Sequence, residues 1–338
     1  MLAAAIAVFI LLTLVLYALM GGADFGGGMW DLLASGPRAA DQRNAIAGAI
    51  APIWEANHMW LILAVVLLFT GFPAAFAAMM TALFVPVIVM LIGVVLRGSA
   101  FVFRNYDLRP GATRHRWGTA FGIASLFTPF VQGMILGALA TGRIRVTDGL
   151  VTSGFFAGWL TPFAFACGGL ALGSFAFLAA TYLTLATPDH SPLQNDFRRR
   201  AIGTGTLLGP LAATVFLTAR TGAPDLFHGL TDWWAPWLLL VAGVCALAAL
   251  AALGMRRFAV ARVAAVGQVT SILVGWCLAQ YPNLITPDVT VANAGAPAAT
   301  LRLLIMALAA GTVILLPSLV FLFRLFKGGE PRVDSQQS

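Results

Sequence analysis

Long apolar stretches, separated by short polar connections, dominate this chain. Spanning the hydrocarbon core of a bilayer takes a helix of about 20 apolar residues. Nine stretches meet that length: residues 3–33, 44–69, 74–96, 118–140, 157–184, 201–219, 235–254, 260–280 and 301–325. Turn-forming sequences separate several of them, for example Thr70-Gly71-Phe72-Pro73. The pattern predicts an all-α polytopic membrane protein with nine transmembrane helices.

Composition and charge placement agree with this class. Only 10% of the residues are charged, against about 25% in soluble domains. Between the predicted spans, 16 of the 20 Lys and Arg residues fall on one side, and the other side receives only Arg143, Arg145, Arg220 and Arg302. The positive-inside rule then predicts a periplasmic N-terminus and a cytoplasmic C-terminus. The net charge of +7 is explained by topology and contact with membrane lipids, so no nucleic-acid partner is expected.

The order of the spans suggests an internal division. Spans 1–4 and 5–8 both begin on the outside, which is compatible with two four-helix bundles plus one C-terminal helix. We therefore expect a first unit over residues 1–150, which carries the polar site described next. A second four-helix unit with the ninth helix would cover residues 151–328, and a polar cytoplasmic tail residues 329–338.

Polar chemistry concentrates in the first predicted hairpin. Residues 51–60 place Glu55, Asn57 and His58 inside an otherwise apolar stretch. An ionisable group in a membrane helix costs about 2.5–3.5 kcal/mol on insertion scales and usually marks a functional site. Asp24 lies about as far before the predicted turn as Glu55 lies after it, so both acids should sit at a similar depth. We expect them to share a wet polar pocket.

Helical spacing suggests which other side chains accompany Glu55. His58 follows it by three residues and shares its face, and Trp54, Asn57 and His58 are spaced three and four residues apart. The indoles of Trp54 and Trp60 bring donors that need acceptors when buried. Carboxyl and imidazole groups together are what a proton relay needs. We therefore predict a proton path through Glu55, Asp24 and His58, with Trp54, Asn57 and Trp60 shaping it.

Arg97, near the cytoplasmic end of the third span, belongs to the same prediction. It either tunes the two acids electrostatically or pairs with one of them in a purely structural ion pair. Metal binding is not expected, because Glu55 and His58 form only half of a di-iron pattern and no second half exists.

The histidines limit the cofactors that this chain can hold. The sequence has four, His58, His115, His190 and His228, and only His58 falls within a predicted span. One intramembrane histidine cannot provide bis-histidine haem ligation, so the chain alone should bind no cofactor. A phosphate-binding loop of the Gly-Lys-Ser/Thr type is also missing, which gives no support to an ATP-driven pump.

Two segments carry a resemblance to a known family: residues 22–29 (GADFGGGM) and residues 51–62 (APIWEANHMWLI). They resemble subunit II of the cytochrome bd-type ubiquinol oxidases, and the compact loops fit the branch often called cyanide-insensitive oxidases. Weaker matches extend over nearly the whole chain: Leu96-Arg97-Gly98 with Phe101 and Arg104, residues 161–183, Tyr281-Pro282-Asn283 and residues 317–328.

The resemblance implies a haem-free, nine-helix subunit of a complex in the bacterial inner membrane. Its partners would be a haem-bearing subunit I, in some members a single-helix small subunit, and membrane lipids. The complex would oxidise quinol and reduce dioxygen to water, with haems b and d and the quinol site in subunit I. An acid at the position of Glu55 would belong to a proton channel from the cytoplasm, with Asp24 nearby. Some members carry Asp in place of Glu55 and Gln in place of His58.

Two alternatives remain at this stage. Parallel repeats with polar residues near the midplane also describe a stand-alone secondary transporter with a proton-coupled site. The second alternative is a haem-free assembly scaffold, in which Glu55 has no relay role.

Overall fold

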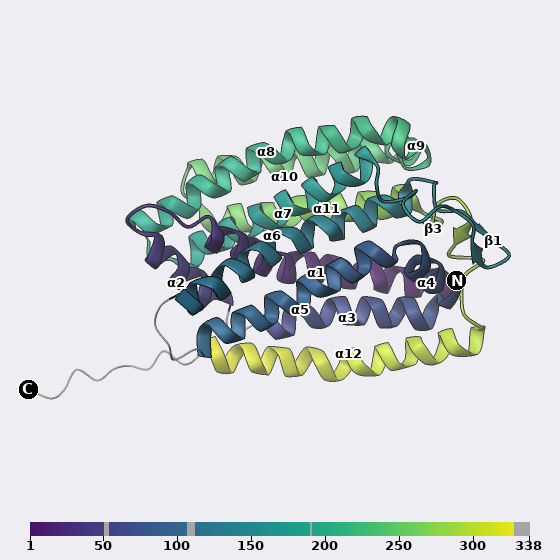
Figure 1. Cartoon of the computed structure of the whole chain (residues 1–338), viewed down its shortest axis with the longest axis horizontal. Helices are drawn as coiled ribbons and strands as arrows, with labels where there is room; N and C mark the ends of the chain where they lie inside the picture. The colour runs from purple at the N-terminus through teal and green to yellow at the C-terminus, as the bar shows by residue number, and fades with distance from the viewer. Residues whose placement is uncertain (51–53, 107–111, 190, 328–338) are drawn as a thin grey trace, which may run out of the picture.

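The protein is a bundle of long, roughly parallel and antiparallel helices (Figure 1). The computed structural model describes residues 1–50, 54–106, 112–189 and 191–327. Its twelve helices are α1 (Leu2–Leu32), α2 (Ala39–Ile50), α3 (Trp54–Gly71), α4 (Pro73–Ala82), α5 (Phe84–Tyr106), α6 (Ala112–Ala140), α7 (Pro162–Ala186), α8 (Pro192–Gly222), α9 (Pro224–Thr231), α10 (Ala235–Gly254), α11 (Phe258–Gln280) and α12 (Ala298–Lys327). Two short hairpins complete it: β1 (Val146–Thr147) with β2 (Leu150–Val151), and β3 (Asn283–Ile285) with β4 (Val289–Thr290).

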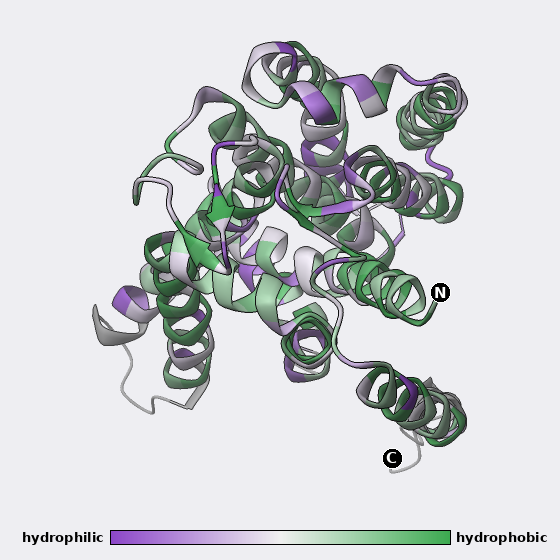
Figure 2. Cartoon of the chain, turned by 90° about the vertical axis from the view of Figure 1, so that its right-hand side faces the viewer, coloured by the Kyte–Doolittle hydropathy of each residue, from purple (hydrophilic) through white to green (hydrophobic). Residues whose placement is uncertain are grey.

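The all-helical membrane class is confirmed. Within the described residues, eight helices are long and apolar enough to cross a membrane: α1, α3, α5, α6, α7, α8, α10 and α11. α12 adds a shorter apolar stretch, Ala298–Ile314, and runs along the bundle beside α3 (Figure 1). A view from the hairpin end shows that hydrophobic residues make up most of the helical ribbon (Figure 2). The ninth crossing and the orientation in the membrane stay predictions.

Two predicted spans have different boundaries in the structure. The stretch 44–69 contains the end of α2 and most of α3, and its residues 51–53 lie outside the described part. The stretch 74–96 is broken, because α4 ends at Ala82 and α5 begins at Phe84. Pro86 lacks a backbone N–H and fits best in the first turn of a helix, which agrees with the start of α5 at Phe84. The crossing helix is therefore α5, about ten residues later than predicted.

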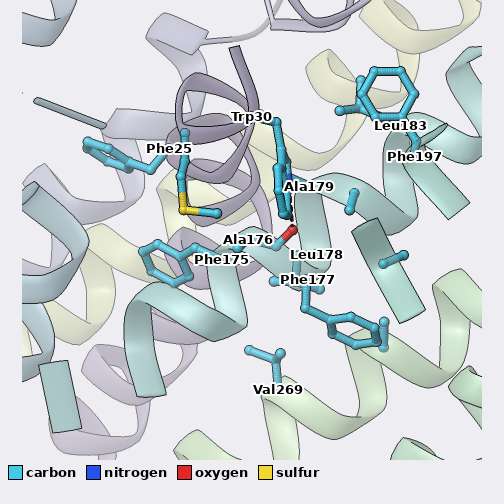
Figure 3. Packing of buried hydrophobic residues seen from close by; sticks show 14 of the residues in the cluster. Phe25, Trp30, Phe175, Ala176, Phe177, Leu178, Ala179, Leu183, Phe197 and Val269 are labelled. Carbon is cyan, nitrogen blue, oxygen red and sulfur yellow. Dashed lines mark hydrogen bonds between the residues drawn. The ribbon is translucent and has the colours of Figure 1, made fainter. Parts of the chain in front are cut away.

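Helix α1 lies at the centre of the bundle, in contact with α3, α6, α7, α11 and α12. Its glycines allow this close packing. A methyl group on Gly26 would collide with the backbone oxygen of Phe175 on α7, and one on Gly28 would collide with Ser125 on α6. Small residues let membrane helices approach closely enough for extensive van der Waals contact. Trp30 strengthens the α1–α7 contact, since its Nε1 donates a hydrogen bond of 2.8 Å to the Ala176 carbonyl (Figure 3).

The bundle has two distinct ends. At the first, which we call the α2 end, α2 follows the end of α1, and Arg38 bonds both carboxylate oxygens of Asp196 on α8 at 2.8 and 2.7 Å. At the second, the hairpin end, Arg145 makes a similar two-bond pair with Asp288. The N-terminus lies at the hairpin end (Figure 1).

Candidate functional site

A buried polar cluster lies between α1, α3, α5 and α6. We call it the intramembrane cluster, and its members come from four helices: Tyr17 and Asp24 on α1, Asn57 and His58 on α3, Arg97 on α5, and Ser125 and Gln132 on α6. Four of the predicted site residues, Asp24, Asn57, His58 and Arg97, are therefore brought together by the fold.

Asp24 is the acid of this cluster, and its side chain is withdrawn from the surface. The residue is 3% exposed, and Nδ2 of Asn57 donates a hydrogen bond of 2.7 Å to its Oδ2. Asn57 itself is fully buried, and its Oδ1 has no hydrogen-bond partner among the described residues. The amide thus holds Asp24 in place and still has one acceptor available.

Arg97 provides the positive charge opposite Asp24. It is 1% exposed, its Nε donates to Ser125 Oγ at 3.2 Å, and its guanidinium lies 4.6 Å from the centre of the Phe25 ring. Arg97 and Asp24 attract each other electrostatically, but no ion pair within 4.0 Å joins them among the described residues. Nη2 of Arg97 also lacks a partner there. The two charges are therefore neighbours without a direct ion pair.

His58 and Tyr17 extend the cluster. Nδ1 of His58 is 2.8 Å from the Trp54 carbonyl, and since that group only accepts, Nδ1 carries a proton; in the neutral ring Nε2 is then an acceptor. The ring is half-buried and lies 5.5 Å from Phe25 and 6.2 Å from Tyr17. The Tyr17 hydroxyl accepts a hydrogen bond of 2.7 Å from Gln132.

Glu55 does not join this cluster, and the expectation that it shares a pocket with Asp24 is wrong. Its side chain is exposed on the outer surface of α3, whereas Asn57 faces inward. Two residues correspond to about 200° around a helix, so Glu55 must point away when Asn57 faces Asp24. Equal depth along two helices does not fix the direction in which a side chain points.

A shallow apolar groove opens on the outer surface between α5 and Trp54, the residue that precedes Glu55 on α3. Its volume is about 430 Å³, and it is lined by Trp54, Val94, Val95, Gly98, Ser99, Val102 and Phe103. Trp54 also contacts Phe101 in a tilted arrangement, with ring centres 5.7 Å apart. Trp60, the other predicted supporting tryptophan, packs against the apolar core at the centre of the bundle.

An ion pair near the α2 end was missed by the sequence reasoning. Arg104 donates to Oδ2 of Asp31 at 2.7 Å, and Asp31 is 2% exposed. A signal was available: Tyr17, Asp24 and Asp31 follow one another at seven-residue intervals on α1, as do Arg97 and Arg104 on α5. Seven residues are close to two full helical turns, which places such residues on one face.

The fold and the site together define a polytopic membrane protein with a charged cluster inside its helices. The chain belongs to the cytochrome bd terminal oxidase subunit II family, whose model matches residues 2–326. It is 26% identical over 328 residues to the putative cytochrome bd menaquinol oxidase subunit II of Bacillus subtilis, covering 92% of this chain and 91% of that protein. It is 30% identical over 174 residues to subunit 2 of the cytochrome bd-I ubiquinol oxidase of Escherichia coli, and this match covers 51% of this chain and 45% of that protein.

A solved structure has the same fold. A chain of the bd oxidase from Geobacillus thermodenitrificans superposes with a TM-score of 0.80 at 23% identity, covering 96% of this chain and 98% of that one. Family membership makes this chain a subunit of a quinol oxidase, an oxidoreductase complex that contains haems and a subunit I. It favours the oxidase interpretation over the stand-alone transporter.

The residues described here do not form a haem site of the bis-histidine type. His58 is packed among aromatic rings, and His115 and His228 are exposed on α6 and α9. His190 lies outside the described residues. In the same part of the chain, no three His, Cys, Asp or Glu side chains are grouped as a metal site would need.

Proposed function

We propose that this chain is the haem-free subunit of a quinol:dioxygen oxidoreductase of the bacterial inner membrane. Haems b and d and the quinol site would belong to subunit I, with a single-helix small subunit as a further partner and lipids around the rest. The α2 end would face the cytoplasm, because most of the basic residues connect the helices there. Residues 1–150 and 151–328 would form the two units, with residues 329–338 as the tail.

We further propose that the intramembrane cluster is part of a proton path from the cytoplasm. The observation that carries this proposal is the buried carboxyl group of Asp24, bonded to Asn57 and close to Arg97 without a direct ion pair. Asn57 Oδ1, Arg97 Nη2 and Gln132 Oε1 are buried and have no hydrogen-bond partner within the described part of the chain. Buried polar atoms of this kind are usually satisfied by internal water. Water between an acid, an amide and an imidazole is what proton transfer within a membrane requires.

Glu55 would carry the proton out of this chain and toward subunit I. Its neighbours on the outer surface of α3 are apolar, for example Met59, which is 59% exposed, and Ile62, which is 54% exposed. A carboxyl group facing lipid among such side chains costs about 2.5–3.5 kcal/mol. A partner that covers Glu55 and the neighbouring groove removes this cost, and subunit I is the partner that family membership implies.

The test compares Glu55→Gln with Glu55→Asp in the assembled complex. We expect Glu55→Gln to lose most oxidase turnover and proton uptake while its haem content stays normal, and Glu55→Asp to keep both activities. Asp225→Asn on α9 is the matched control, because it removes an exposed acid at the hairpin end. Full turnover and proton uptake in Glu55→Gln would refute the relay role, and loss of the haems would support the scaffold alternative.

A further inference from the structure

A second buried acid lies on the same face of α1 as Asp24, two turns nearer the α2 end. Asp31 is 2% exposed, and its Oδ2 accepts a hydrogen bond of 2.7 Å from Arg104. Its other oxygen, Oδ1, is buried and has no hydrogen-bond partner among the described residues. An unpaired carboxylate oxygen in an apolar bundle is costly unless water or a proton satisfies it.

Positive groups surround Asp31 from three helices. Arg104 of α5 bonds its carboxylate, Arg43 of α2 donates to its backbone oxygen at 3.4 Å, and Arg200 of α8 donates to the neighbouring Trp30 carbonyl at 3.4 Å. The Arg104 side chain is 11% exposed, so this group lies just beneath the surface. Asp31 therefore lies one side chain beneath the surface of this chain near the α2 end.

One polar side chain and the buried Phe121 ring, which contacts both Arg97 and Arg104, lie beside the segment of α1 between Asp31 and Asp24. Gly28 lies between the two acids on α1 and presents no side chain, and Ser125 of α6 occupies the space beside it. Ser125 Oγ accepts from Arg97 Nε at 3.2 Å, which joins Ser125 to the intramembrane cluster. Seven residues of helix span about 10 Å, a distance that a few hydrogen-bonded waters can bridge.

We propose that Asp31 is the residue that accepts protons at the cytoplasmic mouth of the path, and this inference rests on the proposed function. A proton from water binds Oδ1, while Oδ2 keeps its hydrogen bond from Arg104. The proton then passes to water beside Ser125 and on to Asp24, and Asp31 returns to the carboxylate form. Arg104 is a positioning residue, since it fixes one oxygen and leaves the other free.

The experiment uses the purified complex with subunit I and follows proton uptake during dioxygen reduction with a pH-sensitive dye. We expect Asp31→Asn to slow proton uptake by about tenfold or more, with little change in haem content or in haem reduction by quinol without oxygen. Asp31→Glu should restore most of the rate. Asp196→Asn is the matched control, because it removes a different acid, paired with Arg38, at the same end.

The outcomes separate this inference from the proposed function. Normal proton uptake in Asp31→Asn, or equal slowing of uptake and anaerobic haem reduction, overturns the role of Asp31. If Asp24→Asn slows proton uptake and Asp31→Asn does not, only the inference about Asp31 fails. If neither variant slows proton uptake, the inference and the proposed proton path both fail. If the complex with Asp31→Asn does not assemble, the infrared absorption band of the carboxyl groups is recorded during turnover. A turnover-dependent band that shifts in Asp31→Glu supports the inference, and the absence of a shift overturns it.

Discussion

Substituting alanine for Gly26 tests the contact on which the position of α1 depends. A methyl group there would overlap the backbone oxygen of Phe175 and lie 2.7 Å from Ala179 Cβ. Neither atom can rotate away, so α1 and α7 would have to separate. Overpacking of this kind costs about 1–3 kcal/mol, and the better helix propensity of alanine returns somewhat less than 1 kcal/mol.

A net loss of about 1–2 kcal/mol corresponds to about 5- to 30-fold in an equilibrium constant. The assay is the half-life of the detergent-solubilised complex at a fixed elevated temperature, because large membrane complexes unfold irreversibly. We expect Gly26→Ala to shorten this half-life clearly, and Gly22→Ala to shorten it less, because a methyl group there meets only the Phe175 ring, at 2.5 Å.

Gly203→Ala on α8 is the matched control. A methyl group at Gly203 would meet nothing within 4 Å, so the half-life should stay the same or lengthen. If Gly26→Ala and Gly203→Ala behave alike, the close packing of α1 against α7 is wrong.

Two further predictions concern Trp30 and the hairpin end. Trp30→Phe removes the hydrogen bond to the Ala176 carbonyl and weakens the stacking of Arg200, whose guanidinium lies 5.0 Å from the centre of the Trp30 ring. We expect a loss of about 1–2 kcal/mol in thermal stability. The control Trp237→Phe, at a position that is 69% exposed, should leave the thermal stability unchanged. The hydrogen bond from Arg145 lowers the pKa of the Asp288 carboxyl group in the folded protein. The stabilisation that this pair gives is therefore fully present above the unfolded pKa of about 3.9, and it is lost as the pH falls through the lower folded pKa. The difference in melting temperature between the wild type and Asp288→Asn should therefore persist from neutral pH down to about pH 5 and shrink toward about pH 3; a difference that grows on acidification would contradict the pairing.

Hydropathy predicted most of the helices because lipid imposes a simple length rule on apolar segments. It could not predict the break at Leu83, since α4 and the start of α5 are equally apolar and only Pro73 and Pro86 mark their ends. The length that a crossing helix needs does not fix where within a long hydrophobic stretch the crossing begins.

The site was predicted partly, and the missing part has a geometric reason. Residue type and depth were enough to bring Asp24, Asn57, His58 and Arg97 together. The outward direction of Glu55 follows from its position two residues before Asn57, because two residues turn a helix by about 200°. This argument can be made only once Asn57 is known to face inward. Asp31 was overlooked because an acid near a helix end looks like ordinary surface charge, although its spacing from Asp24 pointed to the same face.

The central position of α1 has a consequence for the biogenesis of this protein. The helix is synthesised first, yet α6 and α7, which pack against its glycines, emerge from the ribosome much later, and so do Asn57 on α3 and Arg104 on α5, which bond its two acids. Until then Asp24 and Asp31 must remain uncovered in the membrane or be sheltered by the insertion machinery. Assembly of this subunit is thus expected to be most vulnerable between the synthesis of α1 and that of α7.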